Sequence, residues 1–264
     1  MGHMHGTTVR RRATATAALT LALATAACGA EDGSAGPPHA TATARHAAAE
    51  PKPSPETGRV LTQHQLEAAV IDKGDLPGLW IEGVGSGADG TEGAGNGPAR
   101  PVAADLTDPA ACAPVDGASY GVGRHTPVGS VRRTAKAGAG AATFALVSYR
   151  HGDATRTLDD LRTALEHCTA FHEKGVKDTR FTDIRPADTA PTCDDTVSFR
   201  YTKVLTGSDG KDMKIPSRLT AFRCGSTVAA FLAMTVDGTA ASPEIPEDLL
   251  HAQARALKAA AGTS

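Results

Sequence analysis

The C-terminal half of the chain alternates apolar and polar residues as β-strands do. In DTVSFRYTKVL, residues 195–205, Val197, Phe199 and Tyr201 alternate with polar side chains. This period of two predicts a strand with one face turned toward a core. Two more strand-like segments, SRLTAFRC and TVAAFLAMTV, follow on either side of Gly225-Ser226. We therefore expect a meander of three antiparallel strands.

Earlier segments have the same strand-like character. In AATFALVSYR, residues 141–150, Phe144 and Leu146 share one face of the predicted strand, while Val147 and Tyr149 share the other. The turn AGAG joins it to the strand before. The remaining predicted strands are GLWIEGV (78–84), PVGSVRRTAK (127–136) and TRFTDIRP (179–186).

The first helix is predicted from its capping residues. Thr62 stands three residues before Gln65, which is the spacing of a capping box. Leu61 and Leu66 occupy the two hydrophobic positions that often pack together across such a cap. Gly74 is expected to end this helix.

Two further helices follow from a period of three to four residues. The segment 154–175 carries apolar residues at helical spacing, and Gly175 is expected to close it. Cys168 falls on the apolar face of that helix, so it points toward the core. A last helix begins at Pro246. The apolar positions of these two helices are Leu158, Leu161 and Leu165, and Leu250, Ala254 and Leu257.

Together these elements predict an α+β fold with a mainly antiparallel sheet of about six or seven strands and about three helices packed on one face. Residues 58–264 are numerous enough for one sizeable core. Only 4% of the chain is aromatic, so that core rests on Ala, Val and Leu, and disulfides would contribute appreciably to stability.

The N-terminus is typical of an exported lipoprotein. Three arginines, residues 10–12, precede the uncharged run 13–27, which is shorter than the roughly 20 residues of a membrane-spanning helix. Ala26 and Ala27 before Cys28 resemble a bacterial lipobox, although Thr25 stands where leucine is usual. We interpret residues 1–27 as a signal peptide and Cys28 as the lipidated residue. An ordinary signal peptide with an incidental Cys28 is the alternative, and the Sec and twin-arginine export routes both stay open.

The segment that follows is predicted to be a disordered tether. Residues 28–57 contain no large apolar side chain, so they cannot bury enough surface to offset the entropy of the chain. Without the three arginines of the signal peptide, the remaining chain carries 24 basic against 29 acidic residues. This charge makes nucleic acid an unexpected partner, and it leaves the lipid as the predicted membrane contact.

Four cysteines remain for the exported domain, and they predict two disulfides. If 197–204 pairs antiparallel with 217–224, Cys193 and Cys224 meet at the same end of the pair. We therefore favour Cys193–Cys224 with Cys112–Cys168, while the two other connectivities stay open. His167 and His172 lie near Cys168, but we interpret them as solvated side chains of a surface helix. No metal site and no cofactor are predicted.

Two short motifs suggest catalysis or cofactor binding, but their surroundings argue against it. Gly85, Gly87 and Gly90 match a dinucleotide fingerprint, yet the residues after them cannot start the helix that such a site needs. The segment 117–121, GASYG, has the form G-x-S-x-G around Ser119. A nucleophile elbow lies between a strand and a helix, and the flanking residues predict neither, so we interpret GASYG as a glycine-rich turn.

The exported part as a whole resembles a known class. The lipobox, the polar tether, the opening helix in LTQHQLEAAVIDKGDLPG and the four cysteines resemble actinobacterial lipoproteins. Residues 60–260 more loosely resemble the PknH-type extracellular sensor domain. That resemblance implies an antiparallel sheet with helices, two disulfides within the domain and a cleft for an unidentified ligand. It transfers no ligand-binding residue to this chain.

The leading functional hypothesis is a lipid-anchored, non-catalytic binding or sensor-like domain on the extracytoplasmic face of the cell membrane. Its ligand would be a small molecule or an envelope protein, and the loops 85–98 and 206–216 are expected to border any cleft. One alternative is a secreted serine hydrolase that uses Ser119. Another is an envelope protein–protein interaction module with no small ligand, which would present a flat apolar patch.

Overall fold

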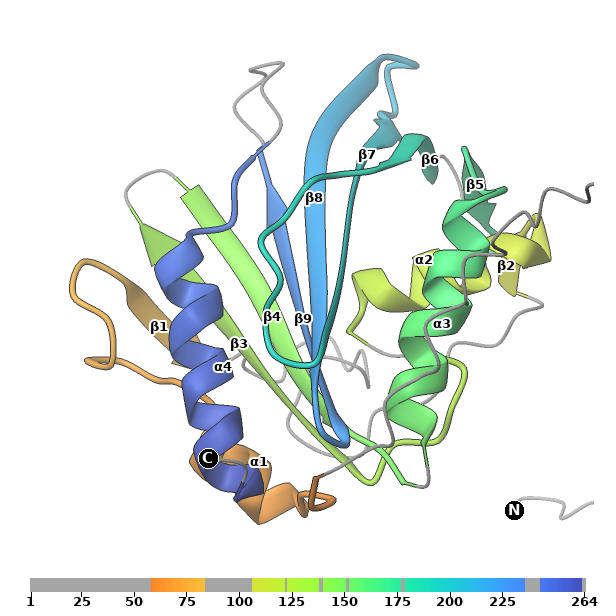
Figure 1. Cartoon of the computed structure of the whole chain (residues 1–264). Helices are drawn as coiled ribbons and strands as arrows, with labels where there is room; N and C mark the ends of the chain where they lie inside the picture. Colours follow the sequence, from red (N-terminus) through yellow and green to blue (C-terminus); the bar gives the residue numbers. More distant parts are fainter. Residues whose placement is uncertain are drawn as a thin grey trace, which may run out of the picture. The chain divides into compact units, whose positions relative to one another are not determined.

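A computed structural model describes residues 58–83, 106–121, 123–137, 140–150, 152–176, 179–235 and 243–262. All of these belong to one compact unit of the chain. Among them, no helix combines the length and the apolar composition needed to cross a bilayer. The described residues form a single antiparallel sheet with helices beside it (Figure 1).

The sheet has nine strands within the described ranges, in the order β1-β3-β4-β9-β8-β7-β6-β5-β2. The α+β class and the C-terminal meander agree with the sequence prediction, but the sheet has two more strands than expected. The additional ones are β2 and β5, of two and three residues, which are too short to show a period. The strands are β1 (Trp80–Gly83), β2 (Thr107–Asp108), β3 (Gly129–Ala137), β4 (Gly140–Ser148), β5 (Phe171–Glu173), β6 (Thr179–Pro186), β7 (Asp195–Thr206), β8 (Asp212–Cys224) and β9 (Thr227–Met234).

The helices cover both faces of the sheet, so the expectation of one covered face is wrong. On β4, Phe144 and Leu146 pack in a core with α4, whereas Val147 packs in a second core with α3, together with Tyr149 just after the strand. Figure 1 shows α1 and α4 at the left of the sheet and α2 and α3 at the right. The four helices are α1 (Gln63–Ala69), α2 (Ala113–Ser119), α3 (Asp153–Leu165) and α4 (Glu247–Ala261), and a 3-10 turn, Ala110–Cys112, leads into α2.

Helix α1 begins as predicted but ends early. Thr62 and Gln65 form the capping box, while the helix stops at Ala69 instead of continuing to Gly74. The buried side chain of Gln253 on α4 explains this end. Its Nε2 donates to the carbonyl of Ala69 at 2.9 Å, and its Oε1 accepts from the amide of Ile71 at 3.1 Å. These bonds satisfy the backbone groups that a longer helix would have used.

Helix α3 also ends before the predicted position. It stops at Leu165, and the chain then turns through Cys168 into β5. Phe171 of β5 stacks on Phe181 of β6 with 4.3 Å between ring centroids. This aromatic packing and the pairing of β5 with β6 hold the segment as a strand, so the helix does not continue through it. Gly175 lies in the turn after β5 with a φ of +85°.

The structure contains the two disulfides that the sequence analysis favours. Cys112 is joined to Cys168 with 5.3 Å between their Cα atoms, and Cys193 to Cys224 with 5.2 Å. The first ties the 3-10 turn before α2 to the segment after α3. The second joins the entry to β7 with the end of β8, where Asp195 pairs with Arg223.

Candidate functional site

The G-x-S-x-G segment is the end of a helix, which corrects its interpretation as a plain turn. Ser119 is the last residue of α2, and its Oγ donates to the carbonyl of Val115 at 3.3 Å. Gly121 has a φ of +74°, and a Cβ there would lie 2.5 Å from the Cβ of Ala145. The motif therefore has a packing role, and Ser119 does not lie on a strand-to-helix elbow. The other glycine motif, Gly85 to Gly90, and the loop 85–98 lie outside the described residues.

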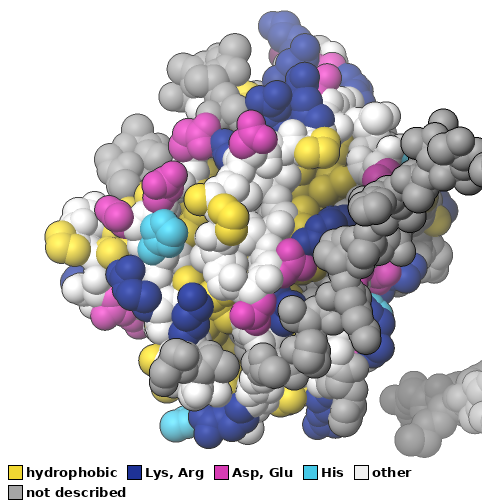
Figure 2. Space-filling view, viewed as in Figure 1, with side chains coloured by type: hydrophobic (Ala, Val, Ile, Leu, Met, Phe, Trp, Pro, Cys, Tyr) yellow, Lys and Arg dark blue, Asp and Glu magenta, His cyan; other side chains and the backbone are white. Residues whose placement is uncertain are grey.

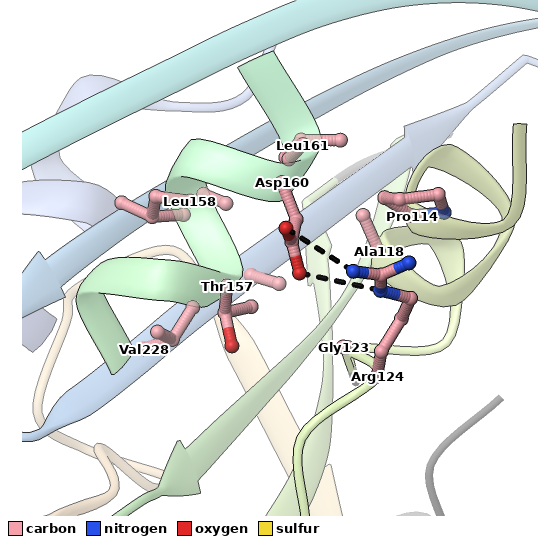
Figure 3. A pocket seen from close by; sticks show the side chains of 12 residues that line it. Pro114, Ala118, Gly123, Arg124, Thr157, Leu158, Asp160, Leu161 and Val228 are labelled. Atoms are coloured by element: carbon pink, nitrogen blue, oxygen red, sulfur yellow. Dashed lines mark hydrogen bonds and ion pairs between the residues drawn. The ribbon is translucent and has the colours of Figure 1, made fainter. Parts of the chain in front are cut away.

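A small groove lies between α2 and α3, over strands β8 and β9 (Figure 3). Its volume is about 20 Å³, enough for about one water molecule. An ion pair lies beside it, with 3.3 Å between Nε of Arg124 and Oδ2 of Asp160. Apolar side chains form most of the lining, namely Pro114, Ala118, Leu158, Leu161, Ala221, Val228 and Ala230.

The segment beside this groove is fixed firmly to α3. His125 places Nδ1 3.3 Å from Asp153 and Nε2 3.1 Å from Asp160. The amide of Gly123 donates to the hydroxyl of Tyr149 at 3.1 Å. Because the groove has room for only about one water molecule, it is too small for an organic ligand in this conformation.

A larger and more polar depression lies at the N-terminal end of α4. We call it the α4 depression. It has a volume of about 90 Å³ and lies between the segment 188–192, strand β8 and residues 244–251. The predicted bordering loop 206–216 is not part of it, because none of its residues is among those that line the depression. Its lining residues are Asp188, Thr189, Ala190, Thr192, Arg218, Thr220, Glu244, Ile245, Glu247, Leu250 and His251.

Arg218 is held in place in the α4 depression. Its Nη1 lies 2.7 Å from Oε2 of Glu244, and its Nη2 donates to the carbonyl of Asp188. Only 17% of the Arg218 side chain is exposed, against 75% for Glu244. Arg218 neutralises one carboxylate, while two further acidic residues, Asp188 and Glu247, also line the depression. Figure 2 shows acidic side chains gathered around this end of α4.

A third polar cluster is buried where α2 meets the β2–β5 edge. Asp116 on α2 is only 2% exposed. Its Oδ2 accepts a hydrogen bond of 2.7 Å from the hydroxyl of Thr107, but its Oδ1 has no hydrogen-bond partner among the described residues. Burial and, to a smaller extent, the negative charge of nearby Glu173 raise the pKa of Asp116 to about 7, against the lowering effect of the hydrogen bond from Thr107.

Two tyrosines belong to this third cluster. The hydroxyl of Tyr120 donates to Oε1 of Glu173 at 2.6 Å. Burial raises the pKa of Tyr120, and Glu173 adds to that effect. Burial likewise raises the pKa of Tyr201 on β7, while a hydrogen bond with Ser119 lowers it. Both phenols therefore stay protonated and can donate hydrogen bonds at neutral pH.

The two histidines near Cys168 are on the surface, but not on a helix. His167 follows the end of α3, and its side chain is 76% exposed. His172 lies on β5, where its Nε2 is 3.3 Å from Oδ2 of Asp108. In the part of the chain that the structure describes, no three His, Cys, Asp or Glu side chains are grouped as metal ligands.

Comparisons with known proteins give weak similarities. No family model and no curated protein matches the chain. Among solved structures, the extracellular domain of PknH from Mycobacterium tuberculosis is similar with a TM-score of 0.43 and 12% identity, over 78% of this chain and 100% of that one. A putative uncharacterised protein from Mycobacterium smegmatis, the Rv0999 ortholog, gives a TM-score of 0.34 and 11% identity, over 78% and 97%. Because both TM-scores are below 0.5, no functional statement about this chain rests on either similarity.

Proposed function

We propose that this chain is a lipid-anchored extracytoplasmic domain that binds a small, positively charged polar ligand in the α4 depression. The observation that carries the proposal is the lining of that depression. It combines three carboxylates, one arginine and several hydroxyl groups around a volume of about 90 Å³. Convergent polar groups in a concave site can fix the orientation of a bound ligand and give it specificity.

The charges favour a ligand that carries an ammonium group. Glu244 is already paired with Arg218, so Asp188 and Glu247 are the carboxylates available to an incoming cation. The hydroxyl groups of Thr189 and Thr192 supply hydrogen bonds to polar ligand atoms. Arg218 also disfavours a second guanidinium or ammonium group close to itself.

Calorimetric titration with ethanolamine, which carries one ammonium group and one hydroxyl group, tests this ligand class. We expect Glu247→Gln to weaken its binding about tenfold, because a charge-assisted hydrogen bond is lost. The control is Glu166→Gln, which removes an exposed carboxylate at the end of α3 and should leave binding unchanged. No heat of binding in the wild-type protein, or equal affinity in Glu247→Gln, would contradict the assignment of the site. Malonate, which has the opposite charge, should not bind.

The anchoring part of the proposal rests on the sequence. Residues 1–27 serve as the signal peptide, Cys28 carries the lipid and residues 28–57 form the tether. We expect Cys28→Ser to move the protein from the membrane fraction into the medium, because a diacylated cysteine supplies the hydrophobic attachment. Fractionation of cells followed by immunoblotting measures this. A Cys28→Ser protein that still sediments with membranes would show that another segment holds it there.

A further inference from the structure

Asp116 and Glu173 form an acidic pair brought together by two edge strands. Thr107 on β2 is the cross-strand partner of Glu173 on β5, and its hydroxyl also donates to Oδ2 of Asp116. The remaining Asp116 oxygen, Oδ1, is buried without a hydrogen bond among the described residues. A buried polar atom that makes no hydrogen bond lowers the stability of the folded state.

The charges around the pair do not compensate two ionised carboxylates. Tyr120, directly after α2, is a neutral donor to Glu173, and Tyr201 on β7 is a buried phenol. The positive charge of Lys203 on β7 lowers the pKa of Asp116. Its effect on that pKa is the smallest among the groups that act on Asp116. Its Nζ lies 5.5 Å from the ring centre of Phe181. The neighbouring pair of Asp108 and His172 occupies the next cross-strand positions, whose side chains point to the other face of the sheet.

We propose that Asp116 and Glu173 share one proton in the folded protein, and that this proton fastens α2 to the β2–β5 edge of the sheet. The shared proton supplies the donor that Oδ1 of Asp116 lacks. It also removes the repulsion between two carboxylates that form no ion pair with another described residue. Loss of the proton leaves two negative charges at this junction and weakens the contact between α2 and the edge strands.

The proton makes the stability of the domain depend on pH. The folded pair holds its proton up to a pH of about 7, as the raised pKa of Asp116 indicates, whereas an aspartate in the unfolded chain releases it near pH 4. Between these values the folded state binds about one proton more than the unfolded state. The contribution of the pair to stability is therefore present below about pH 4 and is lost as the pH rises to about 7. Over this range the equilibrium constant for unfolding increases about tenfold per pH unit.

Urea unfolding of the full chain between pH 5 and pH 8 tests the proposal with Asp116→Asn. Asparagine has the shape of the protonated acid and donates to Glu173 without a charge. We expect the stability of the variant to be closest to that of the wild type near pH 5, the lower end of this range. At pH 8 its unfolding equilibrium constant should be at least tenfold smaller than that of the wild type. The matched control is Asp194→Asn, which alters a carboxylate paired with Arg223 and should destabilise the protein at both pH values.

Two results would overturn the proposal. One is a wild-type to Asp116→Asn difference in stability that does not change between pH 5 and pH 8. The other comes from Glu173→Gln, which removes the neighbouring charge and should move the pH dependence to lower pH. An unchanged midpoint in Glu173→Gln would show that Glu173 has no part in holding the proton. Hydrogen exchange of the α2 amides, corrected for intrinsic rates, should increase above pH 7 in the wild type and stay constant in Asp116→Asn.

Discussion

Two aspartates of this domain lie close to its two disulfides in sequence, and they have opposite surroundings. Asp194 follows Cys193, and its Oδ2 accepts from Nη1 of Arg223 at 3.2 Å and from the amide of Gly225 at 2.6 Å. Its side chain is 41% exposed. Asp116 is almost fully buried, accepts one hydrogen bond from Thr107, and lies beside a second acid.

The two aspartates show two different roles that a carboxylate can have in a fold. Asp194 neutralises the buried Arg223 and fixes the turn between β8 and β9, so its charge supports the fold. Asp116 has no such counter-charge, so its ionisation works against the fold. The contact of Asp194 with the β8–β9 turn is therefore structural. The stability of the contact between α2 and the β2–β5 edge, where Asp116 lies, depends instead on pH.

The largest effects are expected from the disulfides themselves. Replacing both members of either pair by serine should lower the free energy of unfolding by about 4 kcal/mol, because the unfolded chain gains conformational entropy. The Cys112–Cys168 pair closes the longer loop, with a separation of 56 residues against 31 for the other pair. Its loss should cost about 0.5 kcal/mol more in the chain-entropy account. Urea unfolding measures both values, and a reversed order would show that loop length does not decide the difference.

Asp194→Ala should lower the free energy of unfolding by about 3 kcal/mol, because it leaves the buried guanidinium of Arg223 without its carboxylate. We expect this loss to be nearly the same at pH 5.5 and pH 8. Arg200→Ala, which removes an exposed arginine from β7, is the control and should cost less than about 0.5 kcal/mol. A loss at Asp194 as small as that of the control would remove the contrast between the two aspartates.

Thr107→Val should cost about 1–2 kcal/mol, since Oδ2 of Asp116 then loses its buried donor. The hydroxyl of Thr107 lowers the pKa of Asp116, so its removal should also move proton release from the pair to higher pH. Stability curves at several pH values measure both effects. A shift of proton release to lower pH would contradict the described hydrogen bond.

Tyr120→Phe should have the smallest effect, below about 1 kcal/mol, because this side chain is 43% exposed. Its hydroxyl donates to Glu173 and so favours the ionised form of the pair. Without that donor the pair should hold its proton to slightly higher pH. The same pH series measures this, and a downward shift would show that Tyr120 does not donate to Glu173.

Sequence patterns predict the long elements well because each carries its own period. The strands β6 to β9, the capping box of α1 and the start of α4 all follow from neighbouring residues. The two-sided covering of the sheet also has a local signal, since TVAAFLAM in β9 is almost continuously apolar. Such runs are typical of strands buried on both faces, so the alternation on β7 alone is an incomplete guide.

The polar sites escape sequence reasoning because their members come from distant parts of the chain. Asp116 and Glu173 meet only after β2 and β5 have paired, and both strands are too short to predict. Arg218 stands on a predicted strand, but its partners are Asp188, in an irregular segment, and Glu244, before α4. No local spacing links these residues, so tertiary packing alone creates both sites.

The central claim is that Asp116 and Glu173 hold one proton at neutral pH, and carboxyl NMR tests it most directly. Side-chain carboxyl ¹³C shifts of the labelled protein would be followed from pH 3 to pH 9 and assigned with Asp116→Asn and Glu173→Gln. We predict that the pair releases its last proton near pH 7. Release of both protons of the pair below pH 5 would contradict the account.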